Sequence, residues 1–149
     1  MADRAYTITE VSDRSVIMDL YDRQLAAAEA WDFAAYDTTF SATAEIDLRD
    51  FGQPVRPNPE YRSWLESLRP MMVHAQRITG GLRLQLDGDR ATTRVPVICY
   101  VTMEIEGTRT LTYTGLFYND TLARTAEGWR IVQRYEELSW SGAPGQQPS

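Results

Sequence analysis

LRLQLDGDRATTRVPVICYVTMEIEG (Leu82–Gly107) decides the fold class of this 149-residue chain. Apolar side chains alternate with polar ones before the Asp87-Gly88 pair, and alternation resumes after it as far as Glu106-Gly107. A period of two is typical of strands that bury one face, and Asp-Gly pairs favour tight hairpin turns. The stretch therefore predicts two antiparallel strands, the second of them unusually long.

The same period continues toward the carboxyl end. Apolar residues alternate with polar ones from Leu111 to Phe117. A turn at Glu127-Gly128 then leads into the last predicted strand, Trp129–Trp140. An antiparallel meander is therefore expected over the second half of the chain. Strands this long must curve, and a curved sheet closed by helices leaves a cavity.

The first half has a helical period instead. Ser12 or Asp13 is expected to cap a first helix, whose apolar face is formed by Val16, Ile17, Leu20, Tyr21, Leu25 and Ala28. Asp32 is expected to cap a second, short helix. Helices followed by an antiparallel meander predict the α+β class.

Two further elements are expected between the second helix and the meander. Thr43–Leu48 has the pattern of a strand, with Leu48 on its apolar side. Asn58-Pro59 is typical of a helix start and predicts a third helix that stops near Pro70 and buries Trp64, Leu65 and Leu68.

Composition narrows the class of function. Hydrophobic residues make up 43% of the chain, charged residues 24%, and the net charge is −6. These values are ordinary for a soluble domain, and the absence of a basic run argues against a nucleic-acid partner. The apolar stretches fall short of the ~20 residues that a membrane span needs. One domain over residues 1–140 is expected, with a disordered Gly/Pro-rich tail over 141–149. The single cysteine, Cys99, excludes an intrachain disulfide and fits a cytoplasmic protein.

Several segments resemble the SnoaL-like family of the nuclear transport factor two-like superfamily. They are DRSVIMDLYDRQL (Asp13–Leu25), EAWDFAAY (Glu29–Tyr36), F-x-x-x-A-x-I-D (Phe40–Asp47), LDGDRATTR (Leu86–Arg94), YNDTLART (Tyr118–Thr125) and GWRIVQR (Gly128–Arg134). The resemblance implies a cone-shaped α+β barrel, in which amino-terminal helices pack on a strongly curved, mostly antiparallel sheet that encloses a pocket. The family includes polyketide cyclases, scytalone dehydratase, epoxide hydrolases, steroid isomerases and small subunits of dioxygenases, so it implies the fold better than the reaction.

The resemblance also marks where dehydratase chemistry is missing. Scytalone-type dehydratases place two histidines and an aspartate in the pocket, and those positions fall here on Arg77, Val101 and Glu29. The chain has one histidine, His74, three residues before Arg77. A His/His/Asp mechanism is therefore not expected, and the Asp-Arg-Asp arrangement of epoxide hydrolases cannot be placed either.

Glu136, Glu29, Arg77 and Tyr118 are the candidate catalytic residues. In similar proteins the position of Glu136 faces the pocket, where an apolar environment would raise the pKa of its carboxyl and suit it to acid–base work. Glu136 could equally belong to an exposed Glu136-Glu137 pair. Glu29, at the place of the family acid, could instead be a solvated charge at a helix end. Arg77 could bind a carbonyl or enolate oxygen, or form a salt bridge; Tyr118 could donate to substrate, or simply pack.

A second group of residues is expected to contact the substrate. The resemblance, or the shared side of a strand, places in the pocket Arg134, Leu138, Leu48, Cys99 and Val101, and His74 is expected to line the entrance. For Arg134 a structural ion pair is the stronger interpretation, and for Cys99 a buried thiol is favoured over a nucleophile. No metal ligand set, phosphate loop or nucleophile elbow is found, so no metal and no cofactor are expected.

These features favour a cofactor-independent cyclase of secondary metabolism that acts on a small hydrophobic, polyketide-type molecule. A cyclase can gain much of its rate by folding a flexible substrate, with few catalytic groups. The alternatives are a dehydratase or epoxide-opening hydrolase of the same fold, and a non-catalytic binding or accessory subunit. A homodimer is also expected, paired through the outer sheet face that carries Ile98, Tyr100 and Thr102.

Overall fold

The computed structural model describes residues 3–146, in which the helices precede most of the strands. The helical elements are α1 (Ile8–Glu29), α2 (Phe33–Asp37), the 3₁₀ turn η1 (Arg49–Phe51), α3 (Asn58–Leu68) and the 3₁₀ turn η2 (Arg69–Met71). The strands are β1 (Phe40–Asp47), β2 (Arg56–Pro57), β3 (Met72–Thr79), β4 (Arg83–Asp87), β5 (Arg90–Ile105), β6 (Thr108–Thr125) and β7 (Gly128–Gly142). The α+β class expected from the periods is confirmed.

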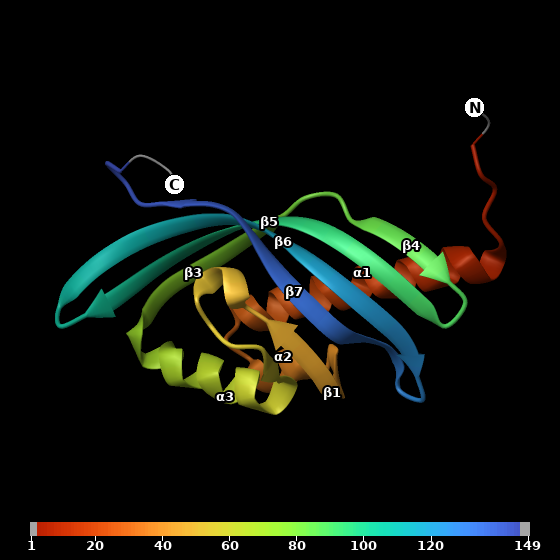
Figure 1. The fold of residues 1–149 in the computed structure, drawn as a ribbon, viewed down its shortest axis with the longest axis horizontal. Helices are drawn as coiled ribbons and strands as arrows, with labels where there is room; N and C mark the ends of the chain where they lie inside the picture. Colours follow the sequence, from red (N-terminus) through yellow and green to blue (C-terminus); the bar gives the residue numbers. More distant parts are fainter. Residues whose placement is uncertain (1–2, 147–149) are drawn as a thin grey trace.

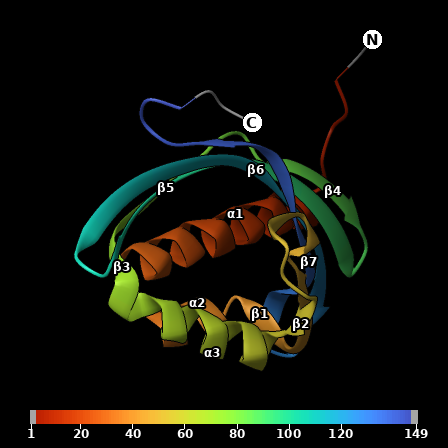
Figure 2. The same cartoon turned by 60° about the vertical axis from the view of Figure 1, so that its left-hand side comes forward.

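The strands form one seven-stranded sheet that is curved and not closed into a barrel. Its order is β2-β1-β7-β6-β5-β3, and β4 pairs with the other end of β5. Every pairing is antiparallel except that of β1 with β7, which is parallel. The sheet arches over α1, and α2 and α3 lie on the far side of that helix (Figures 1 and 2). The concave face, between sheet and helices, therefore holds the core.

Helix α1 begins earlier than the sequence analysis expected. Its cap is Thr7, whose hydroxyl accepts from the Glu10 amide while the Glu10 carboxylate accepts from the Thr7 amide. This reciprocal pair is a capping box, which satisfies two amides that the helix leaves free. The prediction of Ser12 or Asp13 as the cap was wrong, because the Asp13 carboxylate binds Arg124 and Trp129 instead.

The other helix boundaries agree better with the sequence. Asp32 caps α2, as expected, by accepting from the Ala35 amide at 2.9 Å. Helix α3 begins at Asn58, also as expected, but Trp64, Leu65 and Leu68 are only half-buried. The deeply buried aromatic residue of α3 is Tyr61, at 4% exposure.

A bulge in β7 changes which residues face the core. Gly115 of β6 pairs with Trp140, while the next residue, Leu116, pairs with Leu138, so Ser139 is the extra residue of the bulge. Leu138 therefore shares the concave face with Leu116, and Trp140 lies on the convex face over Gly115. Residues 111–117 were expected to bury their odd-numbered members, but the even-numbered positions of β6 from Leu116 to Leu122 are the buried ones.

The carboxyl-terminal end of β7 also differs from expectation. Ser141 and Gly142 were expected to begin a disordered tail, but both belong to β7, and Gly142 pairs with Tyr113. The last three positions of the predicted tail, 147–149, lie outside the described residues.

Candidate functional site

Arg134 anchors a hydrogen-bond network at the centre of the concave face. It is fully buried, and its guanidinium donates to both oxygens of Asp120, at 2.8 and 2.7 Å, and to the Gln24 side-chain oxygen at 2.8 Å. A longer bond of 3.4 Å reaches the Tyr36 hydroxyl, and the Tyr118 ring lies 3.8 Å from the guanidinium carbon. A buried charge is tolerated when it is paired and hydrogen-bonded in this way. The Arg134 donors are thus committed to the protein.

Asp120 is equally well satisfied. Besides Arg134, it accepts from the Tyr21 hydroxyl at 2.6 Å, and that hydroxyl also lies 2.5 Å from the Thr93 hydroxyl. Helix α1, β5, β6 and β7 therefore meet at one polar centre inside an apolar core. Such a network fixes the relative positions of its elements.

Glu136 lies one inward position beyond Arg134 on β7, and its carboxyl is much less satisfied. It is 9% exposed, and the hydrogen bond it accepts comes from the Tyr61 hydroxyl at 3.4 Å. Burial raises the pKa of Glu136; the charges of Arg134 and Arg77 oppose this rise, and that of Asp120 adds to it. A buried carboxyl whose pKa is raised suits a general acid or base.

Three buried tyrosines surround this carboxyl. Tyr118 is its pairing partner on β6, Tyr61 comes from α3, and Tyr36 comes from α2. Burial raises the pKa of all three, so their hydroxyls stay protonated and can donate hydrogen bonds. The site can therefore offer phenolic donors together with one carboxyl.

Arg77 projects toward the same region from β3. It pairs with Cys99 of β5 and is half-buried. Within residues 3–146 its guanidinium forms no hydrogen bond or salt bridge, in contrast to that of Arg134. Guanidinium groups stay charged in proteins, so Arg77 supplies a positive charge with unused donors.

A narrow pocket lies beside Arg77, under the helices. It is lined by Ala28, Trp31, Phe33, Tyr36, Leu65, Met72 and Arg77. Its volume is about 20 Å³, room for about one water molecule. The pocket is therefore much smaller than the deep cavity that the resemblance implied, because tyrosine side chains and the Arg134 network fill the concave face.

Two of the predicted site residues lie elsewhere. His74 is exposed on the convex side, because three residues separate it from Arg77 and neighbouring strand residues alternate between faces. Glu29 is exposed as well, since five residues at about 100° each turn it well away from the buried Gln24. Both border a shallow groove of about 470 Å³ at the sheet edge. In the structure Glu29 and His74 therefore both lie outside the small pocket beside Arg77.

The remaining predicted residues surround the cluster. Leu48 is 3% exposed, and Leu138, Val101 and Cys99 are half-buried. Burial raises the pKa of the Cys99 thiol and so disfavours the reactive thiolate.

The sequence analysis missed Tyr61, Tyr36 and Gln24. Gln24 is a polar residue inside the apolar stripe of α1, and Tyr61 lies one helical turn before Trp64 and Leu65 on α3. A polar residue within an apolar helix face signals a buried hydrogen bond, so both residues could have been found from their spacing.

Fold and site together define a class: α+β proteins in which a curved sheet and amino-terminal helices surround a buried acid. Residues 9–135 match the family described as the SnoaL-like domain. The chain belongs to this family, which confirms the resemblance seen in the sequence.

Relatives agree with this assignment. The uncharacterised protein Rv2910c of Mycobacterium tuberculosis is 32% identical over 131 residues, 87% of this chain and 88% of the relative. The hexachlorocyclohexane dehydrochlorinase LinA-type3 of Novosphingobium barchaimii has a similar structure, with a TM-score of 0.78 and 18% identity, over 92% of this chain and 93% of that one. ActVI-ORFA of Streptomyces coelicolor matches with a TM-score of 0.67 and 16% identity, over 85% and 96%. At these identities the two structures show a shared fold.

Within residues 3–146, no helix is long and apolar enough to cross a membrane. In the same part of the chain, no group of three or more histidine, cysteine, aspartate or glutamate side chains is placed to hold a metal ion.

Proposed function

We propose that this protein is a cofactor-independent cyclase that acts on a small, hydrophobic, polyketide-type intermediate. The observation that carries the proposal is Glu136, a buried carboxyl with one long hydrogen bond, whose pKa is influenced by Arg77. The fold is also that of a protein named as a dehydrochlorinase, so this scaffold accommodates enzymes.

The proposed reaction is an intramolecular aldol closure. The Glu136 carboxylate takes a proton from a carbon next to a carbonyl, and the electron pair moves to the carbonyl oxygen. A buried tyrosine hydroxyl donates a hydrogen bond to the enolate oxygen and stabilises it. The enolate carbon attacks a second carbonyl of the same molecule, and Glu136 returns its proton to the new alkoxide. Atoms and charge balance, and no cofactor is consumed.

Two other functions remain as alternatives. A dehydratase or an epoxide-opening hydrolase could use the same carboxyl to move a proton to a leaving oxygen. A non-catalytic binding or accessory subunit is favoured by the small pocket, about 20 Å³. These functions differ in whether Glu136 is needed for turnover or only for binding.

The deciding experiment replaces the chromosomal gene with E136Q and follows metabolites by mass spectrometry. We expect the uncyclised intermediate to accumulate, because losing a general acid or base costs about 10²–10⁴-fold in rate. E45Q is the matched control, since Glu45 is exposed on β1. An unchanged metabolite profile in E136Q would exclude acid–base catalysis by this carboxyl. Accumulation in E29Q alone would transfer the role to Glu29.

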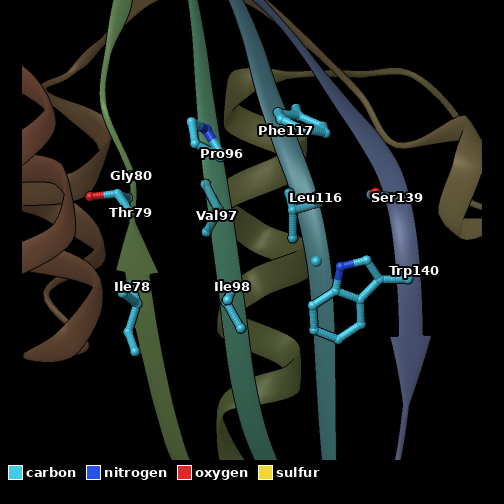
Figure 3. Close-up of a pocket in the computed structure, with 11 residues that line it drawn as sticks. Ile78, Thr79, Gly80, Pro96, Val97, Ile98, Leu116, Phe117, Ser139 and Trp140 are labelled. Atoms are coloured by element: carbon cyan, nitrogen blue, oxygen red, sulfur yellow. The ribbon is translucent and has the colours of Figure 1, made fainter. Parts of the chain in front are cut away.

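We also propose a cytoplasmic homodimer. Cytoplasmic placement is supported by the single unpaired Cys99. Dimerisation is supported by an apolar groove of about 280 Å³ on the convex face, where the Trp140 ring extends from β7 across β6 toward Ile98 of β5, and Ile78 of β3 lines the far side of the same groove (Figure 3). Ile78 is 52% exposed and Tyr100 37% exposed, which is costly for a monomer.

A further inference from the structure

The concave face carries two arginines in opposite situations. Arg134 donates to Asp120, Gln24 and Tyr36 and is fully buried. Arg77 is half-buried beside the small pocket and, in the part of the chain that the structure describes, forms no hydrogen bond or ion pair. A half-buried guanidinium with unused donors can bind an anionic ligand.

The groups that face Arg77 do not supply this anion. Tyr118 on β6, Cys99 on β5, Tyr36 on α2 and Tyr61 on α3 are its electrostatic neighbours. Burial keeps all four uncharged by raising their pKa. Within residues 3–146 the nearby acid of β7, Glu136, forms no hydrogen bond or ion pair with Arg77, and its carboxyl accepts from the Tyr61 hydroxyl instead.

The walls of the pocket define the rest of the ligand. Trp31, Phe33, Leu65 and Met72 are apolar or aromatic. A planar apolar body would pack against them, while a guanidinium binds a carboxylate through two parallel hydrogen bonds. A phosphate, with up to two negative charges, would exceed the single positive charge that Arg77 offers.

We infer that the pocket binds flat, mostly apolar molecules that carry a carboxylate, and that Arg77 holds this carboxylate. The inference rests on the proposed function for the identity of the site and deepens it, because the substrate would be a polyketide-type acid and not its ester or amide.

A ligand of this size requires the pocket to widen. The sheet side is fixed by the Arg134 network, so the helix side must give way. Trp31 lies there with a backbone φ of 57°, a left-handed conformation that a tryptophan rarely adopts, and the guanidinium carbon of Arg69 lies 4.3 Å from its ring centre. The contact between Trp31 and Arg69 joins the α1–α2 turn to the end of α3. We expect this part of the pocket wall to move.

Calorimetric titration with benzoate and benzamide at pH 6 tests the inference, since the two probes share shape and differ in charge. We expect wild-type protein to bind benzoate about 10–100-fold more tightly than benzamide, the range for hydrogen bonds to charged groups. R77M should abolish this preference. R83M is the matched control, because Arg83 is exposed on β4, and it should retain the preference.

Equal affinities in the wild type, no benzoate binding at millimolar concentration, or a preference that survives in R77M would overturn the inference. If circular dichroism shows that R77M does not fold, R77K decides instead: it keeps the charge but loses the fork, and an unchanged preference would overturn the inference. The probes do not react, so this outcome is independent of turnover. An E136Q strain with a normal metabolite profile would remove the proposed function and leave carboxylate binding by Arg77 intact.

Discussion

At the scale of single residues, the burial of Glu136 makes the stability of the protein depend on pH. The pKa of Glu136 is raised in the folded protein because burial disfavours the charged form. At pH values between the pKa of Glu136 in the unfolded chain and its higher pKa in the folded protein, the folded state holds more protons than the unfolded state. The wild type therefore loses stability as the pH rises through that range. Below the pKa that Glu136 has in the unfolded chain, this stability is fully present.

E136Q should remove this loss, because glutamine has no proton to release. We expect its thermal midpoint to exceed that of the wild type at pH 7–8, by about 2–4 °C for each kcal/mol relieved. The difference should vanish toward pH 4. Differential scanning calorimetry across this range is the measurement, with E45Q as the control. A difference that does not change with pH would mean that Glu136 does not titrate as its burial predicts.

The candidate site could be predicted from the sequence only in part. Strand parity was enough to place Glu136, Arg134 and Leu138 on one side of β7. The partners of these residues were not accessible in the same way. Tyr61 lies 75 residues from Glu136, and Gln24 lies 110 residues from Arg134, so their contacts depend on how the helices pack across the sheet.

At the scale of elements, local signals predicted the helices and the antiparallel meander, but they missed strand β3 and the bulge in β7. A bulge inserts one residue into one strand, so every parity argument that crosses it changes sign. Trp140 has the same parity as Leu138 in the sequence, yet it lies on the opposite face of the sheet. The sequence analysis took the wrong set of alternate residues in 111–117 as facing the core. Only the pairing of β6 with β5 settles which set faces inward.

Because the bulge places Trp140 over Gly115, position 115 requires a residue without a Cβ atom. A Cβ atom at this position would lie 2.2 Å from the Trp140 ring, closer than atoms can approach. G115A should therefore displace the ring and destabilise the protein by about 1–3 kcal/mol, the usual cost of overpacking. Tryptophan fluorescence and urea unfolding would measure both effects.

G81A is the control for this substitution, because a Cβ atom at Gly81 would meet nothing within 4 Å. Its free energy of unfolding should stay within about 0.5 kcal/mol of the wild type. Equal stability of G115A and G81A would show that Trp140 rotates away without cost.

At the scale of the whole molecule, the proposed dimer would pair through the convex face. If two copies pair through the groove around Trp140, light scattering at micromolar concentration should give twice the 17.0 kDa mass of the chain. I78E should shift this mass to the monomer, because a charge in an apolar interface is costly. A single 17.0 kDa species in the wild type would contradict the dimer.

The Arg134 network has a consequence for how this scaffold can diversify. It ties helices α1 and α2 to the sheet through Gln24 and Tyr36, and β7 to β6 through Asp120, so substitutions there put folding at risk. Trp31, Phe33 and Leu65 line the opposite wall and take no part in that network. Ligand preference can thus evolve on the helical wall while the sheet wall stays constant. A selection library confined to those three positions should yield folded variants with new ligands far more often than one built on the network.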